Sequence, residues 1–270
     1  MISNMLPAPF LIVNTSEPCW SEDALAPFAA EELMCRRVGE GAKPLVHIWR
    51  HKKAFVLGMR DRRLPYAEEA MARLERDGYA VAVRHSGGAA VPLDPGVVNV
   101  SFIFPRQPGE TDFRSHFETV YRLFRSTLRE CSPDVHKGEI AGSYCPGDYD
   151  LGVGGRKFCG LAQRRQIKAF IVQAFVVVEG EGAARADRVR QFYQTAAAGL
   201  RSGFPQIIPH RMVSLQEICG MRVPDFIRLL TQHLAAMGGE YAPWEAVKPD
   251  SRLLEHTIIQ LRNQYDKKEK

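Results

Sequence analysis

The sequence predicts one α+β domain, with a mixed sheet in its first two thirds and helices that cover one side of the sheet and finish the chain. Along the 270 residues the hydrophobic period switches repeatedly between two and about 3.6, as in alternating strands and helices. No internal repeat or long low-complexity linker divides the chain. Its composition, 45% hydrophobic and 25% charged, excludes a chain that is disordered, collagen-like or coiled coil throughout.

Six segments are predicted to be strands, because they are short, apolar and rich in β-branched and aromatic residues. They are residues 45–49, 54–57, 79–83, 97–104, 157–162 and 169–179. The last is so rich in Val, Ile and Phe that we expect a central strand buried on both faces.

Helices are predicted where apolar residues recur at helical spacing. Ala67, Ala70, Met71 and Leu74 stand at i, i+3, i+4 and i+7, and Gly78 follows as a stop. Residues 113–128 form a longer apolar stripe. The C-terminal third adds helices at 184–200, 225–237 and 251–266, and residues 214–217 fit a capping box that starts a further helix.

The charge pattern and the apolar runs narrow the class of protein. The net charge is +5, from 36 basic and 31 acidic residues, and no concentrated basic stripe points to nucleic acid. The N-terminus lacks a signal-peptide pattern, and no apolar run approaches the roughly 20 residues that span a bilayer. We therefore expect a soluble, cytoplasmic protein that binds neither nucleic acid nor membrane.

The chain has six cysteines, and their spacing matches no metal or disulfide pattern. No C-x-x-C is present, and Cys131, His136 and Cys145 fit no familiar zinc site, so no metal is expected. In an intracellular chain cysteines stay reduced. We expect thiols that serve packing or chemistry.

A glycine-rich segment follows the strand predicted at 79–83. Residues 84–91 read RHSGGAAV, and the paired glycines allow the backbone to approach a ligand closely. Arg84 could then hold a carboxylate or a phosphate. A purely structural turn is the alternative, and the residues alone favour it.

A second segment, residues 142–150, places Cys145 in a loop between Gly, Ser, Pro and Gly. A loop thiol is accessible, and loop amides or a nearby cation favour its reactive thiolate form. The residues alone leave two interpretations open, a nucleophile or a half-buried packing thiol. Asp148 and Asp150 in the same segment fit paired carboxylates or simple caps.

A third segment carries Lys157 into a strand. Gly154 and Gly155 suit a two-residue hairpin turn, so that Lys157 would begin the strand near a ligand. An ammonium close to Cys145 would favour the thiolate and stabilise an oxyanion. The alternative is an exposed lysine on an edge strand. Cys159, between bulky apolar neighbours, is expected to be a packed thiol.

These segments, with residues 47–51 (HIWRH), 56–61 (VLGMRD) and 99–101 (NVS), resemble one superfamily. It comprises lipoate–protein ligases, octanoyltransferases and biotin–protein ligases, and the resemblance is greatest to the octanoyl-[GcvH]:protein N-octanoyltransferases. The resemblance implies a biotin/lipoate protein ligase-like α+β domain, with a large mixed sheet flanked by helices and a smaller sheet beside it. The catalytic domain would span residues 44–270, with residues 1–43 preceding it or packing on it.

The resemblance also implies a reaction and a site. Cys145 would take an octanoyl or lipoyl group from a lysine of the glycine cleavage H protein as a thioester, and pass it to a lysine of lipoyl domains of 2-oxoacid dehydrogenase E2 subunits. Lys157 would stabilise the acyl carbonyl and transfer protons, with no cofactor. The implied substrate-binding residues are Arg84, His85, Ser86, Gly87, Gly88, Gly160 and Gln163.

Three other functions stay open from the sequence. Acyl carrier protein could be the acyl donor in place of the H protein. The chain could instead be an ATP-dependent lipoate–protein ligase that forms an acyl-adenylate on the Arg84 loop. It could also bind lipoyl domains without catalysis.

Overall fold

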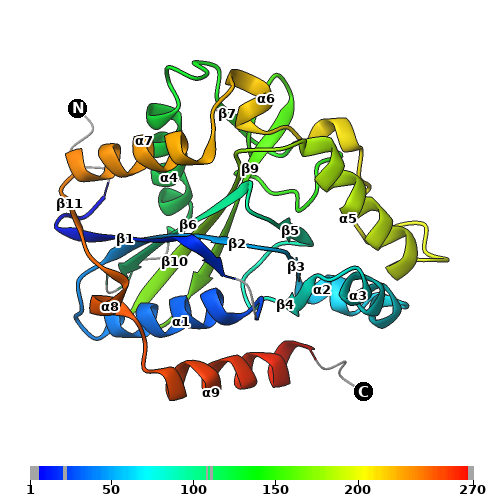
Figure 1. The fold of residues 1–270 in the computed structure, drawn as a ribbon, viewed down its shortest axis with the longest axis horizontal. Helices are drawn as coiled ribbons and strands as arrows, with labels where there is room; N and C mark the ends of the chain where they lie inside the picture. Colours follow the sequence, from blue (N-terminus) through cyan, green and yellow to red (C-terminus); the bar gives the residue numbers. More distant parts are fainter. Residues whose placement is uncertain (1–5, 21–22, 108, 110–111, 267–270) are drawn as a thin grey trace.

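The computed structural model describes residues 6–20, 23–107, 109 and 112–266. In this part of the chain an eight-stranded mixed sheet has the order β11-β1-β2-β6-β10-β9-β8-β7, and a three-stranded sheet has the order β4-β3-β5 (Figure 1). The expected combination of a large mixed sheet and a smaller one is confirmed.

The described strands and helices have the following bounds. The strands are β1 (Phe10–Trp20), β2 (Leu45–His51), β3 (Ala54–Leu57), β4 (Ala80–Val83), β5 (Val91–Leu93), β6 (Val97–Pro105), β7 (His136–Lys137), β8 (Leu151–Val153), β9 (Arg156–Arg165), β10 (Ala169–Val177) and β11 (Gly239–Tyr241). The helices are α1 (Ala26–Gly39), α2 (Met59–Arg62), α3 (Ala67–Arg76), α4 (Arg114–Thr127), α5 (Gly182–Ala196), α6 (Leu215–Cys219), α7 (Val223–Ala236), α8 (Trp244–Val247) and α9 (Ser251–Leu261), with short helices η1 (Pro209–Arg211) and η2 (Arg262–Asp266).

All six predicted strands are confirmed within a few residues, and so are the predicted helices. The capping box is present, because the Ser214 side chain accepts from the Glu217 amide. Gly154 and Gly155 form the hairpin turn between β8 and β9, with φ of 58° and 70°. Strands β1, β5, β7, β8 and β11 were not predicted, and residues 10–39 supply β1 and α1 to the large sheet and its helical cover.

Helices lie on both faces of the large sheet, so the prediction that they cover one side is wrong. Figure 1 shows α4 and α7 on one face, and α1 and α9 on the other. Eight of the nine residues of β6 are buried, in both side-chain orientations, which requires cover on each face. Val98, Val100 and Phe102 pack with α4 and α7, whereas Ile103 packs with α1.

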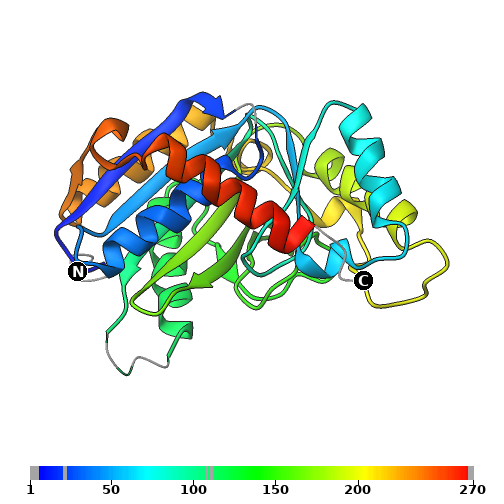
Figure 2. The ribbon, with the colours of Figure 1, turned by 90° about the horizontal axis from the view of Figure 1, so that it is seen from below.

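The small sheet lies beside the large one, flanked by α3 and α5. Phe55 of β3 packs on Phe192 of α5 with ring centroids 5.3 Å apart. Figure 2 shows α9 running along α1, with the small-sheet region at one end of the molecule. A single apolar cluster joins this region to Trp49 and Phe175 of the large sheet. Side chains from both sheets therefore line the space between them.

Two cysteines form a disulfide, so the prediction of a packing role as reduced thiols is wrong for them. Cys131 follows α4, Cys219 ends α6, and their Cα atoms are 5.6 Å apart. The partners are 88 residues apart in sequence, and only the packing of α4 against the C-terminal helices brings them together. Cys35 and Cys159 are buried free thiols, as expected.

No helix in the described residues is long and apolar enough to cross a membrane.

Candidate active site

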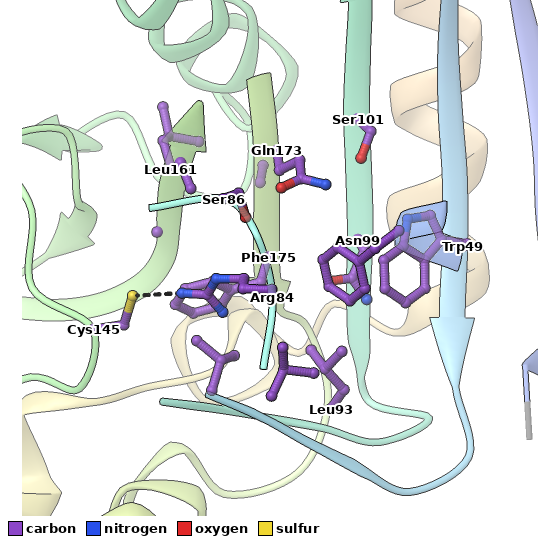
Figure 3. A pocket seen from close by; sticks show the side chains of 16 residues that line it. Trp49, Arg84, Ser86, Leu93, Asn99, Ser101, Cys145, Leu161, Gln173 and Phe175 are labelled. Atoms are coloured by element: carbon purple, nitrogen blue, oxygen red, sulfur yellow. Dashed lines mark hydrogen bonds between the residues drawn. The ribbon is translucent and has the colours of Figure 1, made fainter. Parts of the chain in front are cut away.

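Cys145 lies in the loop before β8, with its sulfur turned toward the glycine-rich segment. Arg84 Nη2 is 3.3 Å from Cys145 Sγ (Figure 3). The Ala89 amide also donates to Sγ, from 3.2 Å. The Cys145 backbone has a φ of +48°, a conformation that L-residues other than Asn and Asp rarely adopt. A cation and an amide both directed at one sulfur are typical of a site that stabilises thiolate.

Two glycines make this approach possible. A Cβ at Gly88, whose φ is +105°, would lie 2.7 Å from Cys145 Sγ and 2.5 Å from Arg84 Nη2. A Cβ at Gly58 would lie 2.0 Å from the Gly88 carbonyl oxygen. Both positions therefore exclude a side chain. Gly87 is different, because its Cβ would meet nothing within 4 Å.

The glycine-rich segment is also held from behind. The Tyr193 hydroxyl of α5 accepts from the Ala90 amide at 3.4 Å and donates to Asp61 Oδ1 at 2.7 Å. Asp61 Oδ2 accepts from the Gly58 amide at 2.8 Å. Burial raises the pKa of the Asp61 carboxyl, although the Tyr193 hydrogen bond acts in the opposite direction. These contacts fix the segment that carries the Ala89 amide.

Lys157 is buried and lies against the main chain of the Cys145 loop. Its Nζ donates to the carbonyl oxygens of Tyr144 and Cys145, at 2.9 and 2.6 Å. It also forms an ion pair with Asp150 Oδ1 at 2.8 Å. The alternative of an exposed edge lysine is wrong, since Lys157 is fully buried. The cation at the Cys145 sulfur is Arg84, and Lys157 contacts the Cys145 carbonyl.

A narrow pocket extends from Cys145 across one face of the large sheet, under β3 and β5 of the small sheet. Figure 3 shows Cys145 and Trp49 at its opposite ends. Its lining residues are Phe28, Trp49, Val56, Arg84, Ser86, Val91, Leu93, Asn99, Ser101, Cys145, Gly160, Leu161, Ala162, Gln173, Ala174 and Phe175. Most of this lining is apolar, which suits an alkyl chain better than a charged ligand.

The predicted site residues divide into three groups. Cys145, Arg84, Ser86 and Gly160 line the pocket. Lys157, Gly87 and Gly88 lie next to Cys145 or Arg84 outside the lining.

The other two predicted residues have partners elsewhere. Gln163 Nε2 is 2.9 Å from His116 Nδ1, and His85 Nε2 is 2.9 Å from Glu32 Oε2. Burial raises the pKa of the Glu32 carboxyl, but hydrogen bonds from His85 and Arg164 outweigh this effect and hold it at about 2.

Several residues of the site were missed from the sequence. Trp49 and Asn99 stand inside segments that carried the family resemblance, which was the available signal. Phe175 and Gln173 belong to a strand that was predicted to be buried on both faces. Because its apolar run is continuous, the sequence did not show which side chains face the pocket. The sequence left Asp150 open as a paired carboxylate or a cap, and the structure places it buried in an ion pair with Lys157.

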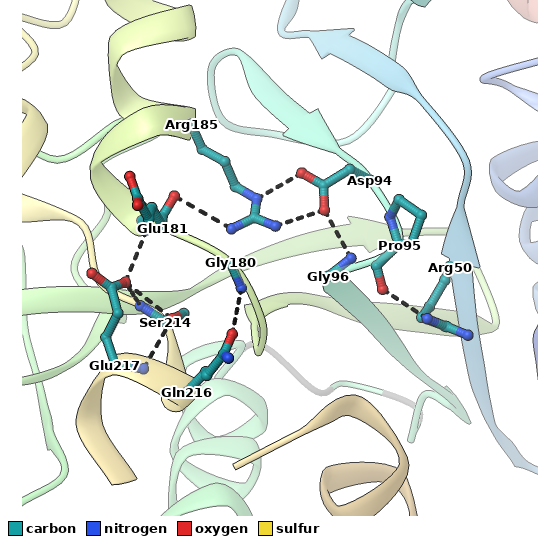
Figure 4. Close-up of polar contacts among 11 residues, drawn as sticks. Arg50, Asp94, Pro95, Gly96, Gly180, Glu181, Arg185, Ser214, Gln216 and Glu217 are labelled. Atoms are coloured by element: carbon teal, nitrogen blue, oxygen red, sulfur yellow. Dashed lines mark hydrogen bonds and ion pairs between the residues drawn. The ribbon is translucent and has the colours of Figure 1, made fainter. Parts of the chain in front are cut away.

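Polar contacts fix the pocket wall formed by β5 (Figure 4). Asp94, which follows Leu93, accepts two hydrogen bonds from Arg185 of α5, at 2.7 and 2.6 Å. The same carboxylate accepts from the Gly96 amide at 2.8 Å. The Gly182 amide at the start of α5 donates to Glu217 Oε2 at 2.9 Å. The turn after β5 is thereby tied to α5, and α5 to α6.

Comparisons with known proteins agree with this geometry. The profile of the Lipoyl protein ligase A/B catalytic domain matches residues 23–235. The octanoyl-[GcvH]:protein N-octanoyltransferase of Geobacillus kaustophilus is 41% identical over 223 residues, which cover 81% of this chain and 79% of that protein. The enzyme of the same name from Anoxybacillus flavithermus is 41% identical over 228 residues, 83% of this chain and 82% of that protein.

A solved structure shares the fold. Lipoate-protein ligase A bound with ATP superposes with a TM-score of 0.68 at 19% identity, over 96% of each chain. At this identity the likeness concerns the fold alone. The matching profile and the two bacterial relatives show that the chain belongs to the Lipoyl protein ligase A/B catalytic domain family.

Proposed function

We propose that this protein transfers an octanoyl group from a lysine of the glycine cleavage H protein to a lysine of lipoyl domains, through a thioester on Cys145. The observation that carries the proposal is the position of the Cys145 sulfur, at one end of an apolar pocket and within 3.3 Å of two donors. The choice of the H protein as donor is supported by the relatives that are named for octanoyl transfer from GcvH. E2 subunits are the acceptors in this proposal, and the compartment is the cytoplasm.

In the first step the Cys145 thiolate attacks the carbonyl carbon of the octanoyl-lysine amide. The C–S bond forms, the C–N bond breaks, and the lysine amine leaves after taking a proton. The Arg84 guanidinium favours the thiolate, and the Ala89 amide is placed to donate to the oxyanion that develops beside the sulfur.

In the second step the ε-amine of a lipoyl-domain lysine attacks the thioester. The new C–N bond forms, the C–S bond breaks, and the amine loses a proton as the thiolate returns. Because the same groups act in both directions, the relative amounts of the two carrier proteins set the direction of transfer. The apolar lining keeps water from the thioester.

Lys157 is the second catalytic residue of the proposal, as electrostatic stabiliser and proton-transfer partner. Its support is the buried ammonium 2.6 Å from the Cys145 carbonyl oxygen, with Asp150 as counter-ion. An ammonium buried at this place adds positive charge beneath the loop that carries the Cys145 sulfur. Arg84, Ser86 and Gly160 shape the pocket in this proposal, and Gly88 allows the close approach of the sulfur.

The test compares three acyl donors side by side. The protein is incubated with octanoylated H protein, with octanoyl acyl carrier protein, or with octanoate and ATP, and the intact mass is measured. We expect one hydroxylamine-labile octanoyl group on the wild-type protein from the H protein, and none on Cys145→Ala. An adduct that persists in Cys145→Ala would contradict the proposal. Faster acylation from octanoyl acyl carrier protein would show that this carrier, and not the H protein, is the acyl donor. Activity that requires ATP would indicate a ligase.

A further inference from the structure

The acyl pocket is lined by two neighbouring rows of side chains across the large sheet, one with Ala162, Gln173 and Ser101 and one that ends at Trp49. Strand pairing places Gly160 opposite Phe175, Phe175 opposite Asn99, and Asn99 opposite Trp49. All four positions line the pocket. Neighbouring strands lie about 4.8 Å apart, so the three steps from Gly160 to Trp49 span about 14 Å. Cys145 lies toward the Gly160 end of this row, since the Lys157 ammonium donates to the Cys145 carbonyl and lies 5.2 Å from the Phe175 ring centroid, and Figure 3 shows Trp49 at the far end.

Trp49 closes the row. The next strand, β1, places Thr15 beside Trp49, yet Thr15 does not line the pocket. The indole is 1% exposed and packs edge-on against Phe28 of α1, with ring centroids 5.3 Å apart. The pocket therefore ends at this ring.

A buried carboxylate holds the ring in place. Trp49 Nε1 donates to Glu31 Oε1 at 2.7 Å, and Glu31 is fully buried. The same carboxylate accepts from Gln173 Nε2 at 2.7 Å and lies 3.0 Å from His47 Nδ1. Hydrogen bonds to a carboxylate are about twice as strong as neutral ones. Three partners on one buried carboxylate make the end of the pocket rigid.

The length of the row fits an acyl chain of limited size. An extended eight-carbon chain measures about 9 Å from its first to its last carbon, given C–C bonds of about 1.5 Å. The thioester link and the bulk of the terminal methyl account for the rest of the 14 Å span. Two more carbons add about 2.5 Å, which would press the chain into the indole.

The free volume of the pocket is about 40 Å³. A cavity of about 150 Å³ holds a six-carbon ring, so lining side chains must move to admit the acyl chain. The spacing of hydrogen-bonded strands does not change in such a movement. The span from Gly160, at the Cys145 end, to Trp49 is then the fixed limit, and we propose that Trp49, positioned by Glu31, sets the maximum acyl chain length at about eight carbons. This inference rests on the proposed function.

The test is a chain-length series on the donor. H protein is acylated chemically with six-, eight-, ten- and twelve-carbon chains, and kcat/KM for transfer to a lipoyl domain is measured with each. Wild-type protein is expected to prefer eight carbons over ten by about tenfold or more, since about 1.4 kcal/mol of steric cost suffices. Trp49→Ala and Trp49→Leu are expected to raise the ten-to-eight ratio at least tenfold. A ratio does not depend on the fraction of protein that is folded.

Two further variants complete the test. Trp20→Leu removes a half-buried tryptophan that does not line the pocket and should leave the ratio unchanged. Glu31→Gln keeps the shape but weakens the bond to the indole, and should raise the ratio about threefold. Unchanged ratios in both Trp49 variants, with the thioester still formed on Cys145, would overturn the length limit and leave the proposed function intact. No acyl-enzyme from any chain in the wild-type protein would overturn both.

Discussion

Gly88→Ala is predicted to slow the reaction of Cys145 more than any other single methyl group added to the glycine-rich segment. The new Cβ would lie 2.7 Å from Cys145 Sγ and 2.5 Å from Arg84 Nη2, distances that real Cβ atoms do not tolerate. The φ of +105° adds about 1–3 kcal/mol of backbone strain. Either the sulfur or the guanidinium must move away, and the contact between them is lost.

The size of the effect follows from that contact. A hydrogen bond to a charged group contributes about 1.5–3 kcal/mol, and 1.4 kcal/mol is a factor of ten. We therefore expect the rate of Cys145 alkylation by iodoacetamide at neutral pH to fall about 10- to 100-fold, and kcat/KM to fall at least as much. Alkylation is followed by intact mass, and circular dichroism verifies the fold.

Gly87→Ala is the matched comparison, because a Cβ there meets nothing within 4 Å. Packing geometry predicts little change in its alkylation rate. If both glycines instead contact the substrate, both variants would lose transfer activity while both kept wild-type alkylation rates. That result would refute the steric account of Gly88.

Three further predictions concern stability and pH. Tyr193→Phe leaves Asp61 without its hydroxyl donor, so the free energy of unfolding measured in urea should fall by about 1–3 kcal/mol. The variant should also have a lower kcat at nearly unchanged KM, and an unaltered kcat would contradict a positioning role. Asp150→Asn leaves the buried Lys157 ammonium without its counter-ion and should lower the free energy of unfolding by about 3–5 kcal/mol. Adding Lys157→Met to this variant should recover part of that stability. Burial lowers the pKa of His51 to about 4, so as the pH falls the unfolded chain binds a proton at this residue before the folded protein does. The free energy of unfolding should therefore fall between pH 6.5 and 4, and His51→Gln should make that fall less steep.

Local patterns were sufficient to predict the α+β class and the central strands, whereas the second, smaller sheet was expected only from the family resemblance. The strand at 169–179 was expected to be buried on both faces, and β10 is buried at every position except Gln173. The same observation required helices on both faces of the sheet, which the prediction of one covered side overlooked. Strand β1 escaped prediction because its second half, from Asn14 to Trp20, is polar and partly exposed.

The sequence was sufficient to predict which residues lie together in the candidate site, but not how they pair. The resemblance singled out Cys145, Arg84 and Lys157, and the structure brings all three together. The resemblance did not show whether Arg84 or Lys157 contacts the Cys145 sulfur, because that depends on how segments far apart in the sequence are placed relative to one another. The pairing of Cys131 with Cys219 was equally hidden, since it depends on helix packing across 88 residues.

The most direct test of the proposed function is the mass of the protein after incubation with octanoylated H protein alone. The proposal predicts one added octanoyl group, located on Cys145 by peptide mapping, removed by hydroxylamine, and transferred to a lipoyl domain when that domain is added. No adduct on the wild-type protein, or one that remains in Cys145→Ala, would contradict the thioester mechanism.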